Sequence, residues 1–116
     1  MRDGDAASGL AGLWARGDGG AVVRITRCGA AWCAENTWVA PERRDREAIG
    51  DVLEMRVAPQ GERRLAGTAW DRRRAARYGL TIDVAADRLD TRGCVFLGLV
   101  CVDMSFTRVS GGTAAR

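Results

Sequence analysis

Apolar and polar side chains alternate with a period of two along most of this chain. Leu80, Ile82 and Val84, for example, are separated by single polar residues. Such alternation is typical of strands that bury one face and expose the other to water, whereas helical periodicity is almost absent. The pattern predicts about eight strands, near residues 12–16, 21–28, 33–39, 52–58, 62–70, 78–86, 88–94 and 101–109.

Turn-forming residues separate the expected strands, as in residues 17–20 and 59–61. Short turns join antiparallel neighbours, so the strands should follow one another as a meander. A meander with one apolar face removes its exposed edges when it closes on itself. We therefore expect an all-β fold, a small closed or nearly closed antiparallel barrel, with one long connection at residues 40–51 that has room for a helical turn.

The length of 116 residues fits one compact domain, which we place at residues 10–109. The segments at residues 1–9 and 110–116 are expected to be disordered tails. The first residues are polar and lack the apolar central region of a secretory signal. Either the protein is cytosolic, or a signal has been removed.

The charged residues change this picture little. All 18 basic residues are Arg, the chain has no His, and the net charge is +3. The 15 carboxylates are scattered among the arginines, and the densest basic stretch, residues 72–77, contains no aromatic residue, so we expect no nucleic-acid partner. The longest apolar run, residues 95–102, is far shorter than the ~20 residues of a membrane-spanning helix, so no membrane span is expected.

Four cysteines form two close pairs, Cys28 with Cys33 and Cys94 with Cys101, each at an expected hairpin. Facing residues of an antiparallel pair lie close enough for a disulfide, and a loop at residues 29–32 would place Cys28 opposite Cys33. Local disulfides are the favoured interpretation; a zinc site, free thiols and cross-pairing between the hairpins are the alternatives. Persistent disulfides indicate an oxidising compartment, so we expect a periplasmic or secreted protein whose signal has been removed.

Trp14 and Arg108 are candidates for a contact between the first and last strands. The alternation of the last strand directs Arg108 toward the interior. In a closed meander the first strand, which carries Trp14, is its neighbour, and a guanidinium stacks well on an indole face. We expect the pair to lock the barrel seam. The alternative is an ordinary buried Trp and a surface Arg.

Together these features form a pattern over residues 10–109. It consists of Gly12-Leu13-Trp14, Val23-Arg24-Ile25, Cys28-Gly29 with Cys33, Leu89, Arg92-Gly93-Cys94, Cys101 and Thr107-Arg108-Val109. This pattern resembles the uncharacterised bacterial family called domain of unknown function 2147, most specifically at the two ends of the chain. The resemblance implies an exported, lipocalin-like barrel of the calycin type, and it implies no established activity or ligand.

The sequence offers little for catalysis. It has no His for acid–base chemistry, no Ser in a nucleophile elbow and no glycine-rich phosphate loop before a helix. We therefore expect a protein that is not an enzyme and uses no cofactor or metal.

The first functional hypothesis is a non-catalytic binding module for a small apolar or amphipathic ligand. A barrel of eight strands encloses either packed side chains or one small ligand. The candidate ligand-binding residues are Trp32, Trp38, Trp70, Phe96 and Phe106. The alternative is that these aromatic residues belong to the core.

The second hypothesis is a structural or protein-interaction module of the cell envelope. Residues 95–100 form an apolar run at an expected hairpin tip. Such a tip either caps the barrel or contacts a partner or a membrane.

Overall fold

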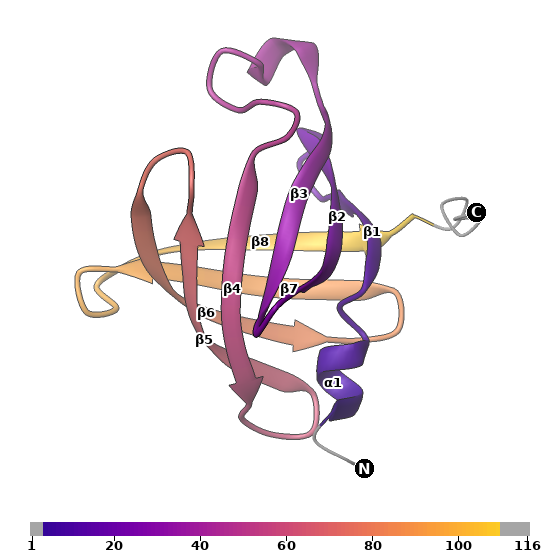
Figure 1. The fold of residues 1–116 in the computed structure, drawn as a ribbon, viewed down its shortest axis with the longest axis vertical. Coiled ribbons are helices and arrows are strands. Elements are labelled where there is room, and N and C mark those ends of the chain that lie inside the picture. The colour runs from indigo at the N-terminus through magenta and orange to yellow at the C-terminus, as the bar shows by residue number, and fades with distance from the viewer. Residues whose placement is uncertain (1–3, 110–116) are drawn as a thin grey trace.

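The structure is a computed structural model, and it describes residues 4–109. Within these residues the chain forms two short helical segments and eight strands (Figure 1). The strands are β1 (Gly12–Arg16), β2 (Ala21–Cys28), β3 (Ala31–Val39), β4 (Val52–Pro59), β5 (Arg64–Asp71), β6 (Ala76–Val84), β7 (Arg88–Val95) and β8 (Val100–Arg108). Each strand pairs antiparallel with the next and β8 pairs with β1, which confirms the expected closed antiparallel barrel.

Period-two alternation sets which face of each strand points inward. In β6, Leu80, Ile82 and Val84 are buried, whereas Asp83 is exposed and forms an ion pair with Arg64 of β5 at 2.7 Å. Apolar side chains thus collect inside the barrel and cross-strand charge pairs cover its outside. Among the described residues, no helix has the length and hydropathy needed to cross a bilayer.

A β-bulge in the β2–β3 pair reverses the alternation of β3. Val22 lies opposite Trp38, whereas Val23 lies opposite Asn36, so Thr37 is the extra residue. An extra residue moves every side chain beyond it to the other face, because successive side chains point to opposite sides of a strand. Trp38 therefore turns outward, where 42% of it is exposed.

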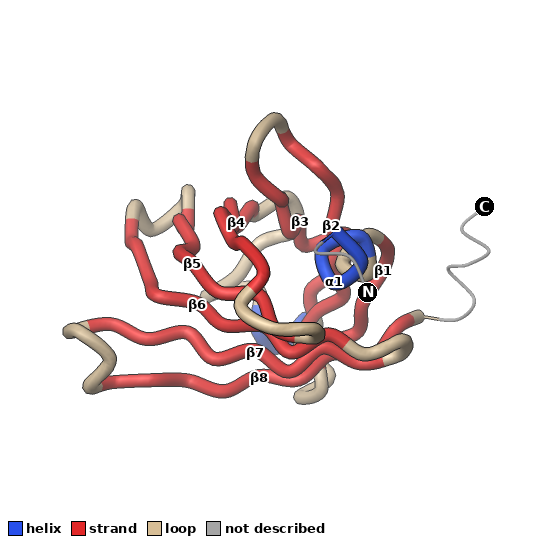
Figure 2. The backbone as a smooth tube through the Cα atoms, turned by 90° about the horizontal axis from the view of Figure 1, so that it is seen from below, coloured by secondary structure: helices blue, strands red, loops and turns tan. Residues whose placement is uncertain are grey.

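The barrel has two unlike ends. The closed end carries the turns β2–β3, β4–β5 and β6–β7 together with helix α1 (Gly4–Ser8), which contacts β4 and β5 (Figure 2). The open end carries the connections β1–β2, β3–β4, β5–β6 and β7–β8. The 3₁₀ helix η1 (Pro41–Arg43) lies in the β3–β4 connection, where the sequence left room for a helical turn.

The N-terminal segment differs from the expectation. The sequence predicts a disordered tail at residues 1–9, but residues 4–8 form α1. Ala6 is 6% exposed and Leu10 is fully buried, and both pack into the core. A five-residue helix is too short to be stable by itself, so it is held by this packing, for which strand periodicity gives no signal. The tails expected at residues 1–3 and 110–116 lie outside the described residues.

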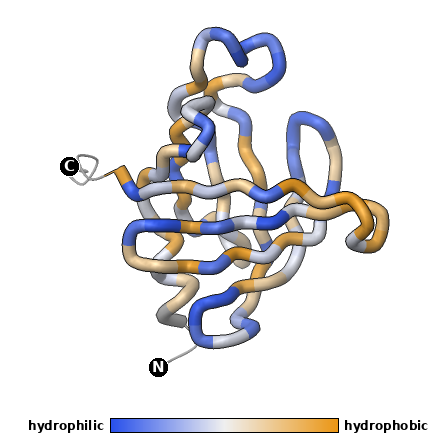
Figure 3. Tube along the Cα trace, turned by 180° about the vertical axis from the view of Figure 1, so that it is seen from behind, coloured by the Kyte–Doolittle hydropathy of each residue, from blue (hydrophilic) through white to orange (hydrophobic). Residues whose placement is uncertain are grey.

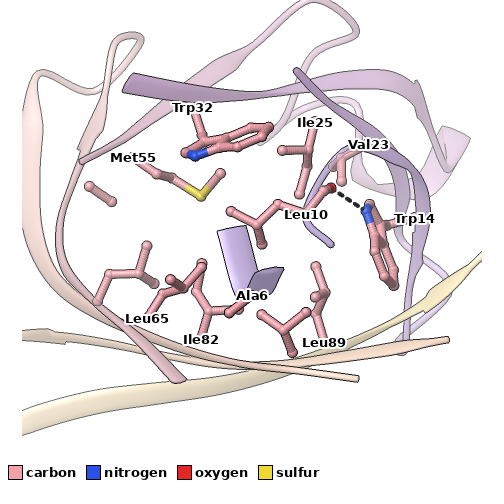
Figure 4. Packing of buried hydrophobic residues seen from close by; sticks show 13 residues of the cluster. Ala6, Leu10, Trp14, Val23, Ile25, Trp32, Met55, Leu65, Ile82 and Leu89 are labelled. Atoms are coloured by element: carbon pink, nitrogen blue, oxygen red, sulfur yellow. Dashed lines mark hydrogen bonds between the residues drawn. The ribbon is translucent and has the colours of Figure 1, made fainter. Parts of the chain in front are cut away.

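The core fills the closed half of the barrel. Trp14, Leu65, Ile82 and Leu89 are at most 1% exposed, and they surround Leu10 of the N-terminal segment, which is fully buried (Figure 4). The indole N–H of Trp14 donates a hydrogen bond of 2.8 Å to the carbonyl of Leu10. Because its one polar group has a partner, this large side chain is buried without leaving a polar group unpaired. The N-terminal segment thus plugs the closed end.

Candidate functional site

The open end of the barrel leads into a cavity of about 600 Å³. Its wall consists mainly of inward-facing apolar side chains from β2, β4, β6, β7 and β8. These include Ile25, Met55, Leu80, Ile82, Met104 and Phe106. Cavities of ~300–1,000 Å³ with apolar walls and a few polar groups are typical sites for small organic molecules. This cavity is therefore the candidate site.

Charged side chains surround the mouth of the cavity. They come from the ends of β1 and β5, the β3–β4 connection and the β5–β6 connection. The rim cations are Arg16, Arg43, Arg46 and Arg74, and the rim carboxylates are Glu47, Asp51 and Asp71. Four cations against three carboxylates give the rim a net charge of +1. An apolar interior thus opens through a polar, slightly basic rim.

Arg16 and Glu47 form a bidentate ion pair on this rim. Nη1 and Nη2 of Arg16 donate to the two carboxylate oxygens of Glu47 at 2.9 and 2.7 Å, and Nε donates to Asp18 at 2.9 Å. The hydrogen bond from Arg16 holds the pKa of Glu47 below its ordinary value of 4.5, against the opposing effect of burial. A two-point contact of this kind fixes orientation as well as distance. It ties the β3–β4 connection to the end of β1.

The β5–β6 connection is tied to the β3–β4 connection as well. Arg73 Nη1 lies 3.1 Å from Asp51 Oδ2, and Arg74 Nη1 lies 3.0 Å from Asp71 Oδ2. Both arginines also donate to the backbone carbonyl of Arg46, at 3.1 and 2.8 Å. These arginines therefore hold two connections together rather than form an unpaired basic patch.

Arg43 is held more loosely than Arg16. Its Nη1 lies 3.5 Å from Asp18 Oδ2 and 3.9 Å from Glu47 Oε2, longer than a good N–H···O hydrogen bond. The side chain is 32% exposed. Since a guanidinium carries five N–H donors, Arg43 has donors to offer to an anionic or strongly polar group at the mouth.

The five aromatic residues that the sequence nominates for ligand binding are not brought together. Of the five, only Phe106 lines the cavity. Trp32 is 7% exposed and belongs to the core, and Trp38 turns outward beyond the β3 bulge. Trp70 faces outward from β5, opposite the outer face of β6, and Phe96 is 73% exposed at the β7–β8 turn.

The sequence analysis missed most of the cavity wall and its rim. Period-two alternation marks Met55, Leu80 and Met104 as inward-facing, and it does not distinguish a packed core from a cavity wall. The rim depends on pairs such as Arg16 with Glu47, which are 31 positions apart. No local pattern connects residues so far apart, so only the closed fold shows that they meet.

Both cysteine pairs form disulfides, which confirms the pairing within each hairpin. Cys94 lies directly opposite Cys101, with Cα atoms 4.1 Å apart. The other hairpin lacks the expected four-residue loop: Cys28 lies opposite Ala31 across a two-residue turn, so its bridge to Cys33 is diagonal and the Cα atoms are 5.8 Å apart. Two disulfides in a chain of this size suggest an oxidising, extracytoplasmic environment.

Trp14 and Arg108 lie opposite each other where β1 meets β8. The guanidinium carbon of Arg108 is 4.2 Å from the centroid of the Trp14 ring. The N–H groups of Arg108 donate to the carbonyl oxygens of Gly9, Ala11 and Ala86, each at 3.0 Å. This arginine therefore joins β8 to the N-terminal segment and to the β6–β7 turn.

Gly12 makes room for that contact. Its φ is 133°, and a Cβ atom at this position would lie 2.7 Å from Nη1 of Arg108. Glycine avoids both the backbone strain and the clash. The contact of Trp14 with Arg108 thus lies at the closed end of the barrel, apart from the cavity mouth.

Neither a curated protein nor a solved structure matches this chain. The sequence profile of one bacterial family does match it, over residues 12–108. The matched segment starts with β1 and ends with β8, so it covers the whole barrel from one side of the seam to the other. The chain therefore belongs to the family described as uncharacterised proteins conserved in bacteria, domain of unknown function 2147 (DUF2147).

Proposed function

We propose that this protein is a binding module that holds one small amphipathic ligand in the open half of the barrel. The observation that carries the proposal is the apolar cavity of about 600 Å³ that opens through a charged rim. An apolar segment of the ligand replaces water in the cavity, and a polar head stays at the rim. The looser contacts of Arg43 favour a head group that accepts hydrogen bonds, such as a carboxylate or a phosphate.

The proposed role is non-catalytic. The sequence contains no His, and Glu47, the best-placed acid of the rim, is held ionised by Arg16, which lowers its pKa. A general acid needs the opposite shift, toward the working pH. The rim carboxylates are therefore better suited to orient arginines than to move protons.

We further propose that the protein works in the periplasm or outside the cell. The two disulfides support this location, since thiols of cytosolic proteins are normally kept reduced. In such a compartment a small barrel has access to lipids and other amphiphiles of the envelope.

A fluorescent fatty acid tests the cavity directly. Ala34→Phe adds a ring to the cavity wall and should weaken binding at least tenfold, whereas Ala66→Phe, which lies on an outer groove, should leave it unchanged. Native mass spectrometry of protein purified from its own host adds a second readout. The proposal fails if no molecule co-purifies and if neither fatty acids nor phospholipids displace the probe from the unmodified protein.

The β7–β8 turn is the surface that a second candidate function would use, that of a structural or protein-interaction module of the envelope. Leu97 is fully exposed there, so this tip does not cap the barrel. Cross-linking in cells from a probe at position 97 tests this role: labelling of one protein supports it, and labelling of no protein argues against it.

A further inference from the structure

The tip of the β7–β8 hairpin, residues 95–100, projects an apolar surface into solvent. Phe96 is 73% exposed, Leu97 103% and Leu99 84%. Figure 3 shows this tip as a strongly hydrophobic end that extends beyond the neighbouring strands. Large apolar side chains exposed together on a monomer usually mark a contact with a partner or a membrane.

The backbone holds these side chains outward. Phe96, Leu97 and Gly98 all have left-handed φ values, of 55°, 57° and 86°. Such values are uncommon for residues other than glycine, and here they form the tight turn between β7 and β8. The disulfide between Cys94 and Cys101 closes the base of the hairpin directly behind the turn. The apolar tip is therefore a fixed feature of the hairpin.

The shape of the tip favours a fluid apolar environment over a protein surface. Its exposed side chains surround a narrow turn and offer roughly 400 Å² of apolar surface, on the basis of ~150 Å² for a large side chain. A stable protein interface takes roughly 800 Å² from each partner. The acyl region of a bilayer covers a convex tip from all sides and needs no matching surface.

The charges near the tip fit the phosphate layer of a membrane. Between Thr91 and Val102 the sequence contains one charged residue, Arg92, and no carboxylate. Two arginines line the groove beside the tip. Arg92 is paired with Asp103 at 2.8 Å, whereas Arg77 lies over the Trp70 ring and has no carboxylate partner among the described residues, so Arg77 is the cation that faces the groove. Arginines near an inserted apolar segment reach lipid phosphates.

The apolar surface continues from the tip into the cavity. Val100 and Val102 share the inner face of β8 with Met104 and Phe106, since residues two apart point the same way. Val102 is 63% exposed, yet it lines the cavity together with Met104 and Phe106. An amphiphile that leaves a bilayer at the tip would therefore meet apolar side chains along the whole route inward.

We propose that residues 95–100 insert into the surface of a lipid bilayer that contains anionic phospholipids and that the open end of the barrel faces this surface. Docking rests on the tip alone. The further step, in which the bilayer supplies the cavity's ligand, rests on the function proposed above.

Flotation with vesicles of phosphatidylethanolamine and phosphatidylglycerol tests the docking. The test variant is Phe96→Asn with Leu97→Asn, because Asn tolerates left-handed φ and keeps the turn. The control is Ile49→Asn, which removes another exposed apolar side chain at the same end of the barrel. The unmodified protein and the control should float with the vesicles, and the double variant should bind at least about tenfold more weakly.

Three results would overturn the docking proposal. The first is that the unmodified protein does not float with the vesicles. The second is that the double variant floats equally well. The third is that the unmodified protein does not bind vesicles but forms a dimer in sedimentation velocity, and that the double variant does not form this dimer.

Binding of a fluorescent fatty acid in the absence of vesicles separates the two proposals. If the double variant still binds the fatty acid but does not bind vesicles, docking and cavity binding are distinct. If the unmodified protein, the double variant and the control all fail to bind the fatty acid, the result counts against the proposed ligand cavity and not against docking.

Discussion

The closed and open ends of this barrel use the same alternation for different purposes. At the closed end, Leu10, Trp14 and Leu65 are fully buried around the N-terminal segment. At the open end, inward-facing side chains of equal hydrophobicity line a cavity, and Leu97 stands fully in solvent. The two halves differ because the N-terminal segment fills the closed half of the barrel. We infer that the closed end supplies most of the stability and leaves the open end free for the binding role proposed above.

The largest expected effect compares two leucines. Leu10→Ala removes a fully buried side chain and should lower the free energy of unfolding by about 2–5 kcal/mol, because it leaves a cavity in the packed half. Leu97→Ala removes a fully exposed one and should change it by less than about 0.5 kcal/mol. Urea denaturation with the disulfides intact measures both. Equal losses would show that the tip packs against the barrel in solution.

The two disulfides should have similar effects on stability and different effects on binding. Replacing either cysteine pair by serines should lower the free energy of unfolding, measured by urea denaturation, by about 2 kcal/mol, because the two disulfides close loops of similar length. Only the loss of Cys94 with Cys101 should also weaken flotation with vesicles, because that bridge lies behind the apolar tip. If the variant without Cys28 and Cys33 instead lost vesicle binding, the assignment of membrane binding to the open end would be contradicted.

Arg108 offers a test of the seam. Arg108→Lys keeps the charge but cannot contact three carbonyls and the Trp14 ring together, so unfolding should become easier by about 1–2 kcal/mol. Arg92→Lys alters an exposed ion pair with Asp103 and should lower the free energy of unfolding by less than about 0.5 kcal/mol. Thermal and urea unfolding of both variants give the comparison. A larger loss for Arg92→Lys would place the critical pairing on the outer face.

The smallest effect concerns the rim of the cavity. The pKa of Glu47 is lowered by its hydrogen bond to Arg16, so this pair contributes stability above pH 4.5 and loses it as the pH falls through the lowered pKa. Glu47→Gln should lower the free energy of unfolding by less than about 1 kcal/mol near neutral pH and should make it less dependent on pH below the ordinary pKa of 4.5. The control is Asp45→Asn, whose carboxylate is 77% exposed and lies 3.7 Å from Arg46. An unchanged pH profile in Glu47→Gln would mean that the Arg16 pair does not stabilise the fold.

The barrel could be predicted from the sequence because its signal is local and repeated. Every expected strand is present within about two residues of its predicted bounds, since alternation and turn residues act over short distances. The sequence nominates Trp38 for ligand binding, but Trp38 faces outward because one bulge residue, Thr37, reverses the alternation. Helix α1 was missed because five residues carry no helical period and depend on burial against the barrel.

The site was harder to predict than the fold. Its aromatic candidates were chosen for chemistry, but whether an inward side chain meets a neighbour or a cavity depends on what fills the barrel. The N-terminal segment fills the half around Trp32, and within residues 4–109 no comparable segment fills the half around Phe106. The rim arises from contacts such as Arg16 with Glu47, which exist only after the chain has closed.

The seam has a consequence for the order of folding. Each hairpin disulfide joins residues only 5 or 7 positions apart, so both bridges can form while the chain is still an open sheet. The contact of Trp14 with Arg108 joins positions near opposite ends of the chain and must form late, because bringing distant residues together costs more conformational entropy. Until then β1 and β8 are unpaired edges. Two chains halted at this stage could exchange those strands, so a weakened seam should favour strand-swapped dimers and aggregates before it lowers the content of native hairpins.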